Sequence, residues 1–566
     1  MRRLALLAAI ALATLGLSAS IDLGQLISPM LQRLRKILGP ATATTSAPAE
    51  VNPVVAVVGG GLAGLAAAIE AYEAGATVYL FDKAKSLGGN SAKATSGING
   101  AETSVQRDKG IQDKVEMFHG DVIRSGAGRS VPALVDVVAG RSADAVEWLM
   151  GDRFGLGLTA IAHCGGHSAP RTHRLPPLPD GRPVPVGFTT IKAVQGYLSS
   201  RPERVNIVTN AEVTRLLVAK DGAVTGLSYR RAAQGGGKGG QGETVEVAAG
   251  AVVLATGGYA FDRSPASLLS KYAPDKLHLA TTSGPQATGD GVRLAEDLGA
   301  ALVDMDQIQV HPTALVDPKD PTNLSKFLGP ETMRGEGGIL VDGTGKRFTN
   351  ELATRIAVTE AIFKHGRPAT RAADGSAVAA AGGVTPTVAF LIMNGAVAEK
   401  FGRGMLGFYK GKGLVTEVED AAAAAALIGT DAATLAATLQ QYARDAHAGA
   451  ADAFGKVTFP VKDFSPDEPL FVAIITPAIH YTMGGVAIDA AGRVLRNAAS
   501  GSAQEPIPRL FAAGEVSGGV HGGNRLAGNS LLECVVMGRV AGREAAAVAL
   551  AGGGSSSGGG AAKAEL

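Results

Sequence analysis

The sequence predicts an α/β fold, because three features between residues 54 and 82 match a strand–helix–strand unit. The apolar run Val54–Val58 indicates a buried strand. The spacing Gly59-x-Gly61-x-x-Gly64 then leads into an alanine-rich helical pattern. A second apolar run, Val78–Phe81, ends in Asp82. Together they predict a Rossmann-like domain that binds a dinucleotide.

Each glycine of this motif has a physical reason. We expect Gly59 to make the tight turn, Gly61 to admit a pyrophosphate close to the backbone, and Gly64 to let the helix pack on the strand. The positive helix end then faces the pyrophosphate. Asp82 is placed to accept hydrogen bonds from ribose hydroxyls, and its charge disfavours a 2′-phosphate. The motif does not distinguish FAD from NAD, and a Gly-rich turn in an ordinary α/β domain is the alternative.

Composition narrows the class of protein. The chain has 566 residues, enough for two or more domains or one large discontinuous domain, and its net charge of +2 does not suggest a nucleic-acid partner. Its two cysteines, Cys164 and Cys534, exclude a disulfide framework and a cysteine-based metal cluster. No CxxCH motif for attached haem is present, so electrons must come from a separate donor.

Residues 1–50 are interpreted as a targeting segment and linker. Basic residues at 2–3, an uncharged run at 4–17 and small residues at 18–20 have the three parts of a signal peptide. The basic stretch 32–36 keeps an organelle presequence open as the alternative. The run at 4–17 is short for a membrane span, so we expect membrane association only through this segment if it is uncleaved.

Two further stretches suit a nucleotide site. The small residues of 86–91 and 94–99 let the backbone approach a large planar ligand such as a flavin, although a plain loop is the alternative. The apolar run 251–254 predicts a buried strand that enters a second Gly turn at Gly257, without another GxGxxG. A second nucleotide site is therefore not expected.

The segments between these motifs carry less information. We expect helices within 111–150, 421–437 and 446–455, and short strands at 205–208, 212–219, 224–229 and 244–247, with a flexible hairpin tip at 234–242.

A basic segment, 163–174, holds three histidines and two arginines. Burying them is costly without an anion or partner, so a buried segment with such a partner and a surface basic loop are both open. Metal binding is less favoured, because no carboxylate or second cysteine follows at ligand spacing.

Other candidate chemical groups occur singly or in pairs. His311 lies at the end of an apolar strand before a proline, a place typical of site residues, although a structural histidine fits equally. Glu331 and Arg334 are three residues apart, and Glu351 and Arg355 four apart, so each pair can meet on one helical face. Either pair alone is more often a surface salt bridge.

The C-terminal region adds a strand, a Gly-rich loop and the start of a helix over 509–533. The exposed backbone amides of 530–532 form a second helix N-terminus that can hold negative charge.

The motifs in combination resemble one family. They are Gly59-x-Gly61-x-x-Gly64, Gly88-Gly-Asn-Ser91, Ala287-Thr-Gly-Asp-Gly291, Gln309-Val-His-Pro-Thr313, Met333-Arg-Gly-Glu-Gly337, Arg347-Phe-Thr-Asn-Glu351 with Arg355, His480-Tyr-Thr-Met-Gly-Gly485 and Gly522-Gly-Asn-Arg-Leu-Ala-Gly-Asn529. This set is similar to the soluble, FAD-dependent fumarate reductases of the succinate dehydrogenase and fumarate reductase flavoprotein superfamily. The resemblance extends from Val54 to about Leu550.

The resemblance implies a Rossmann-like FAD-binding domain interrupted by an α+β capping domain. The FAD-binding domain would comprise 51–313 and 477–549, the capping domain 314–476, and a flexible tail 550–566. The cofactor would be contacted by residues from all of the glycine-rich motifs: Gly59, Gly61, Ala63, Gly64, Asp82, Lys83, Gly89, Asn90, Ser91, Gly97, Ile98, Ala255, Thr256, Gly257, Asp290, Glu515, Asn529, Ser530, Leu531 and Leu532.

The resemblance also implies a reaction. Bound FAD would give a hydride from N5 to fumarate, which yields succinate. His311, His480 and Arg525 would hold the substrate carboxylates, where cations also stabilise developing negative charge. Arg355 would deliver the proton through a relay with Glu331 and Arg334.

Three departures from the family pattern bear on this expectation. Pro330 stands where bacterial members commonly have Thr, which removes one hydroxyl contact to substrate. Ile356 stands where many have Asp, so Arg355 is expected to lack an orienting carboxylate. Asn90 stands where membrane-bound complexes attach FAD through His, so non-covalent FAD is expected.

Alternative functions stay open. A relative that reduces urocanate, a ketosteroid or another activated alkene, an aspartate oxidase, or a non-catalytic flavoprotein would share much of the pattern. The electron donor is expected to be external reduced FMN, FAD or NADH. The C-terminal Lys563-Ala-Glu-Leu566 resembles a degraded retrieval signal, although an accidental match fits equally. Together with the signal-like N-terminus it favours the endoplasmic reticulum lumen or secretory pathway, with the mitochondrion as alternative.

Overall fold

The computed structural model describes residues 53–179, 183–231, 243–369, 385–498 and 504–553. The described residues all belong to one compact unit. The expected targeting segment 1–50 and the hairpin tip 234–242 lie outside the described residues. The tail was expected to start at 550, but helix α17 (Asn529–Gly553) continues to Gly553. The rest of that tail is outside the described residues.

A six-stranded sheet forms the nucleotide-binding part, in the order β21-β22-β10-β1-β2-β6. Its members are β1 (Val54–Val58), β2 (Thr77–Phe81), β6 (Val205–Val208), β10 (Ala251–Leu254), β21 (Arg493–Leu495) and β22 (Pro506–Ala512). All pair in parallel except β21, which pairs antiparallel to β22. The central strands are uninterrupted apolar runs because parallel strands covered on both faces bury every side chain. The predicted strand–helix–strand unit is confirmed.

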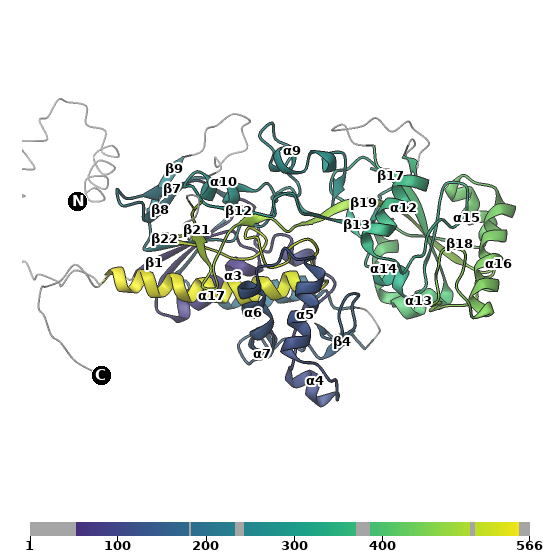
Figure 1. Ribbon diagram of the computed structural model, residues 1–566, viewed down its shortest axis with the longest axis horizontal. Coiled ribbons are helices and arrows are strands. Elements are labelled where there is room, and N and C mark those ends of the chain that lie inside the picture. Colours follow the sequence, from purple (N-terminus) through teal and green to yellow (C-terminus); the bar gives the residue numbers. More distant parts are fainter. Residues whose placement is uncertain (1–52, 180–182, 232–242, 370–384, 499–503, 554–566) are drawn as a thin grey trace, which may run out of the picture. The chain divides into compact units, whose positions relative to one another are not determined.

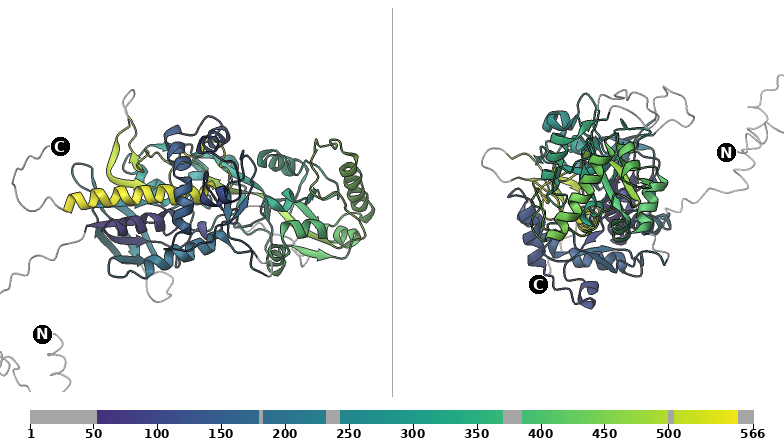
Figure 2. Two further views of the ribbon diagram at one scale, coloured as in Figure 1. Left: turned by 90° about the horizontal axis from the view of Figure 1, so that it is seen from below. Right: turned by 90° about the vertical axis from the view of Figure 1, so that its right-hand side faces the viewer.

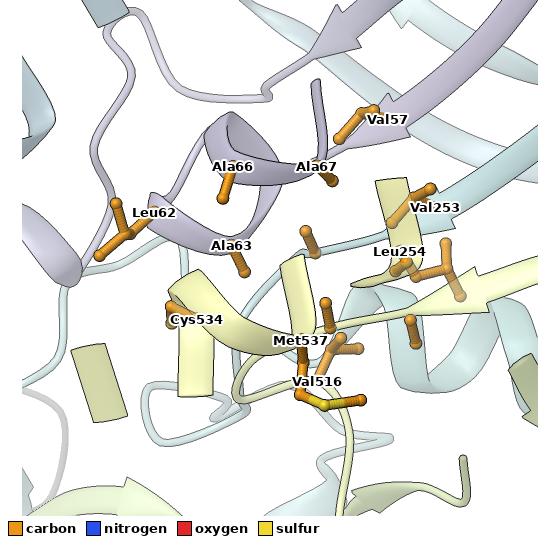
Figure 3. Close-up of a cluster of buried hydrophobic side chains, with 14 of the residues drawn as sticks. Val57, Leu62, Ala63, Ala66, Ala67, Val253, Leu254, Val516, Cys534 and Met537 are labelled. Carbon is orange, nitrogen blue, oxygen red and sulfur yellow. The ribbon is translucent and has the colours of Figure 1, made fainter. Parts of the chain in front are cut away.

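Two long helices pack against each other over this sheet: α3 (Leu62–Glu73), which follows the glycine motif, and α17 (Figures 1 and 2). Two glycines of α17 allow the close approach. A Cβ on Gly538 would lie 2.5 Å from the Ala63 carbonyl oxygen, and one on Gly542 would lie 2.3 Å from that of Ala67. Figure 3 shows α3 side chains and Cys534 and Met537 of α17 in one apolar cluster with Val57 and Val253. The C-terminal helix therefore fixes the helix whose N-terminus faces the nucleotide site.

A second sheet carries a separate hydrophobic core, with the main strand order β14-β13-β19-β17-β15. Its strands are β13 (Ile308–Leu315), β14 (Phe327–Leu328), β15 (Ile339–Val341), β17 (Thr387–Asn394) and β19 (Leu470–Thr482). The second core draws its residues from 315–475, and the first core from either side of that range. Strands β13 and β19 pair antiparallel where the chain passes from one core to the other. This arrangement agrees with an inserted capping domain, although its boundaries at 313 and 477 stay a prediction.

The smaller elements mostly follow the predicted pattern. Helices α5 (Val115–Ser125), α6 (Pro132–Gly140) and α7 (Ser142–Met150) fill 111–150. Strands β7 (Ala211–Val218), β8 (Val224–Arg231) and β9 (Thr244–Ala248) form a three-stranded sheet.

The helices around 421–455 differ from the prediction. Gly429, with a left-handed φ of 78°, separates α15 (Ala421–Ile428) from α16 (Ala432–Ala448), and α16 ends before another left-handed glycine, Gly449. The predicted helix at 446–455 is therefore wrong, because glycine at the C-terminus ends the helix. In the described part of the chain, no single helix is long and apolar enough to span a membrane; α15 and α16 pass that test only as a pair bent by 120°.

Candidate active site

A cavity of about 920 Å³ lies where the glycine turn, the second core and the start of α17 meet. It is lined by most of the residues expected to contact the cofactor: Gly59, Gly61, Ala63, Asp82, Lys83, Gly89, Asn90, Ser91, Gly97, Ala255, Thr256, Gly257, Asp290, Glu515, Ser530 and Leu531. His480 and Arg525 also line it. Gly64, Ile98, Asn529 and Leu532 do not line the cavity. They lie next to residues that do.

The glycine turn fits a dinucleotide. Gly59 has a φ of +107°, and a Cβ there would lie 2.2 Å from the Ala255 carbonyl oxygen. A Cβ on Gly64 would lie 1.8 Å from the Gly59 carbonyl oxygen. Around Gly61, by contrast, the nearest atom is Ser91 Oγ at 3.7 Å, so this side of the turn is open. The backbone is thus crowded where the turn packs and open where the pyrophosphate must approach.

Polar groups along the wall are already oriented. Asp82 accepts hydrogen bonds from the Gly60 amide at 2.8 Å and the Ala84 amide at 2.7 Å. Lys83 Nζ pairs with Asp290 at 2.6 Å. These contacts hold Asp82 and Lys83 at the carboxyl end of β2, where the ribose end of a dinucleotide lies in this fold.

The two histidines expected to hold substrate lie on neighbouring strands. His311 of β13 and His480 of β19 have ring centroids 5.5 Å apart. Burial, with cationic neighbours, holds the pKa of both imidazoles well below the usual range, so both are neutral at pH 7. The Thr313 amide donates to His311 Nδ1 at 3.3 Å, which leaves the proton on Nε2 as a donor. The expected strand end at Pro312 is wrong: β13 continues to Leu315 through an irregular register after His311.

Arg355 and Glu331 form a close ion pair beside these histidines. Arg355 is the first residue of α12 (Arg355–His365), and its Nε and Nη2 donate to Glu331 Oε2 at 2.9 and 2.7 Å. Arg334 Nη2 lies 3.6 Å from the other Glu331 oxygen, so the expected contact at three-residue spacing is present. The expectation that Arg355 lacks an orienting carboxylate is wrong, because Glu331 takes that role. Ile356 is instead 64% exposed.

Glu351 does not pair with Arg355, contrary to the helical-spacing prediction. It accepts from Arg347 at 2.8 and 2.9 Å and from Lys456 at 2.8 Å, and all three side chains are buried. The helix begins only at Arg355, so the two residues are not on one helical face. The Glu351 carbonyl instead accepts from Arg334, which links this buried cluster to the Glu331 pair.

Arg525 lines the cavity, where its guanidinium group is held in place. Its Nη1 donates to the Leu526 carbonyl at 3.0 Å, and its guanidinium carbon lies 4.6 Å from the Tyr481 ring centre. Burial lowers the pKa of Arg525 to about 10, so it stays charged at pH 7.

Sequence reasoning missed Gln309 and Tyr481. Both stand inside recognised motifs, and the alternation of a strand places Gln309 on the same face as His311. That alternation is the signal that could have identified it.

The basic segment 163–174 is only partly at the surface: His163 is exposed, whereas Arg171 and His173 are buried with carboxylate partners nearby. Arg171 is fully buried and pairs with Asp113 at 2.7 Å and Asp121 at 2.5 Å. Burial lowers the pKa of the neighbouring His167 to about 4. The compensating carboxylates come from the preceding helical region, which local spacing does not reveal.

Comparison with known proteins agrees with this geometry. The model of a family described as "FAD binding domain" matches residues 54–531. A protein of Schizosaccharomyces pombe named "Fumarate reductase" is 39% identical over 500 residues, which cover 88% of this chain and 90% of the relative. The chain belongs to the fumarate reductase flavoprotein family.

Other members of this fumarate reductase family are equally close or structurally similar. "Fumarate reductase 1" of Saccharomyces cerevisiae is 39% identical over 504 residues, with 87% of this chain and 98% of the relative covered. The open conformation of a flavocytochrome c3 fumarate reductase superposes with a TM-score of 0.71 at 32% identity and covers 94% of this chain and 82% of that one. FAD is therefore the cofactor of the glycine-lined cavity.

Proposed function

We propose that this protein reduces fumarate to succinate. The relatives named fumarate reductase support this proposal, since they match over most of the chain. Arg355 and Arg525 also lie close enough to contact one shared side-chain oxygen, with two neutral histidines beside them. Such a set suits a short dicarboxylate, whose two negative charges need cations and hydrogen-bond donors at both ends.

The residues of the proposed site have distinct roles in the reaction. Bound FAD supplies the hydride. Arg525 and the neutral imidazoles of His311 and His480 bind the carboxylates and draw electron density away from the double bond. Arg355 gives its proton to the second alkene carbon. Glu331 accepts hydrogen bonds from Nε and Nη2 of Arg355 and returns a proton to this arginine.

Glu331 is suited to return a proton to Arg355. Its side chain is 38% exposed, whereas that of Arg334 is 2% exposed. Its two arginine neighbours hold the Glu331 pKa below its usual value, despite an opposing effect of burial. The carboxylate is thus ionised at pH 7 and able to accept and pass a proton.

The donor and the location belong to the proposal as well. Reduced FMN, FAD or NADH from outside the protein would supply electrons. We propose the endoplasmic reticulum lumen or secretory pathway as its location, with the mitochondrion as the alternative.

Asn90 supports a non-covalent cofactor, because its Oδ1 accepts from the Gly284 amide at 2.9 Å and the side chain offers no attachment atom.

Arg355→Ala tests the assignment of the proton donor. We expect fumarate reduction to fall by a factor of about a hundred to ten thousand, the range for loss of a general acid, while the FAD absorbance is retained. Anaerobic oxidation of a reduced dye by fumarate measures the rate. Arg215→Ala is the matched control, because Arg215 is an exposed arginine on β7 that pairs with Glu246. Full turnover in Arg355→Ala would remove this residue from the mechanism.

A further inference from the structure

Gln309 contacts both arginines of the proposed site but has no role in the proposed reaction. It belongs to β13, where it pairs with Tyr481 of β19, and it is 5% exposed. A buried amide in this position needs all of its hydrogen-bonding groups satisfied.

Two hydrogen bonds donated by the side-chain nitrogen fix the orientation of the Gln309 amide. Its Nε2 donates to Asn524 Oδ1 at 2.9 Å and to the Arg525 carbonyl oxygen at 2.9 Å. Both partners are acceptors in these contacts, so the amide nitrogen must face them. The oxygen is therefore turned toward the proposed site.

That oxygen accepts from both arginines. Arg525 Nη2 donates to Gln309 Oε1 at 3.0 Å, and Arg355 Nη1 donates to the same atom at 3.3 Å. The other two nitrogens of Arg355, Nε and Nη2, face Glu331. One neutral oxygen thus joins the proposed proton donor to the proposed carboxylate-binding arginine.

The two arginines come from different parts of the fold. Arg355 begins helix α12, which packs on the second core. Arg525 precedes helix α17, which packs in the first core. Gln309 lies on the strand that passes between the two cores. Its amide is placed to fix the separation of the two guanidinium groups without neutralising either.

We propose that Gln309 is a positioning residue that sets the spacing of Arg355 and Arg525 and preserves the charge of both. This inference rests on the proposed function. A neutral acceptor orients the cations yet leaves their charge for the substrate carboxylates. A carboxylate in the same place would pair with both arginines and compete with the substrate.

Gln309→Glu tests the requirement for a neutral group with almost no change in shape. We expect KM for fumarate to rise about tenfold or more, since hydrogen bonds to charged groups contribute about 1.5–3 kcal/mol. We also expect kcat to fall and its solvent deuterium isotope effect to grow, because the carboxylate disfavours loss of the Arg355 proton. Gln309→Leu removes the acceptor but adds no charge, so kcat should fall while KM changes less than in Gln309→Glu.

Gln307→Glu is the matched control. It adds the same charge two residues earlier in the chain, at a side chain that contacts Asp306 rather than either arginine. Its kcat, KM and isotope effect should equal those of the wild type. FAD absorbance and the thermal unfolding midpoint are measured for every variant, and if Gln309→Leu does not fold, Gln309→Glu alone decides.

Two results would overturn the inference. One is Gln309→Glu with wild-type KM, kcat and isotope effect. The other is a loss of activity in both Gln309→Glu and Gln309→Leu that is proportional to the loss of bound FAD. In that case kcat would fall in both variants and KM would be unchanged. Succinate binding to the oxidised holoprotein is measured from the change in flavin absorbance. This measurement distinguishes a failure of the Gln309 inference from a failure of the proposed function. If the wild type does not reduce fumarate but binds succinate, weaker binding to Gln309→Glu still supports the role of Gln309, and equal binding contradicts it.

Discussion

Glu515 is a buried carboxyl group on the wall of the cofactor cavity. It accepts hydrogen bonds from the amide and hydroxyl of Thr482 at 3.0 and 3.1 Å, but burial still raises the pKa of Glu515 from 4.5 to about 7. The folded protein therefore holds this proton more tightly than an unfolded chain does. The stability that this provides is fully present below pH 4.5 and is lost as the pH rises through 7.

Glu515→Gln should consequently change how stability depends on pH. Above pH 7 we expect the flavin-free variant to have a free energy of unfolding up to about 3 kcal/mol higher than the wild type, because it buries no charge. The difference should vanish near pH 4. Urea denaturation at pH 4 and pH 8 measures it. A difference that is equal at both pH values would contradict the raised pKa.

At the scale of single residues, the sequence identified the chemical groups better than their partners. Residue type and motif singled out Arg355 and Glu331, and the structure brings them into contact. The pairing of Glu351 with Lys456, 105 residues away, could not be read from local spacing. Helical spacing suggested Arg355 instead, but a helix start between the two residues removed that geometry.

Among the elements, the turn between β1 and α3 makes the most specific demand on residue type. Gly64 packs against the Gly59 carbonyl, and α17 presses on the same helix through Gly538 and Gly542. The turn therefore cannot relax away from an added side chain. Its geometry depends on close packing on both sides.

Gly64→Ala should therefore weaken FAD binding. The added Cβ would lie 1.8 Å from the Gly59 carbonyl oxygen, and we expect the resulting shift to cost about 1–3 kcal/mol, or about tenfold or more in affinity. Fluorescence titration of the flavin-free protein with FAD measures this. Gly140→Ala, at the exposed end of α6 with no atom within 4 Å of the new Cβ, is the control. Equal FAD affinity in both variants would argue against the role of the turn.

Elements with a strong periodic pattern were predicted well, and those that depend on distant packing were not. The strands β1 and β10 and the start of α17 follow from apolar runs and glycine signals. The continuation of β13 through Pro312 did not, because proline normally ends a strand. Pairing with β19 through an irregular register accommodates it.

At the scale of the whole molecule, the site depends on chain segments that are distant in sequence. His311, Arg355 and Arg525 span more than two hundred residues, and Gln309, two residues before His311 on β13, contacts both arginines. Family resemblance predicted this convergence, whereas composition and periodicity alone did not. The buried charges of Arg171 and its two aspartates show the same limit, since the sequence left a surface loop and a buried segment equally open and did not identify the aspartates as partners.

The most direct test of the account is anaerobic turnover of the purified, FAD-loaded protein with fumarate. Reduced FMN, FAD or NADH serves as donor, succinate formation is followed by chromatography, and urocanate, a 3-ketosteroid and aspartate are tried in parallel. We expect succinate to form in proportion to the donor oxidised, and the other compounds to react much more slowly. Donor oxidation that does not depend on fumarate, or turnover of another compound in its place, would contradict the central claim.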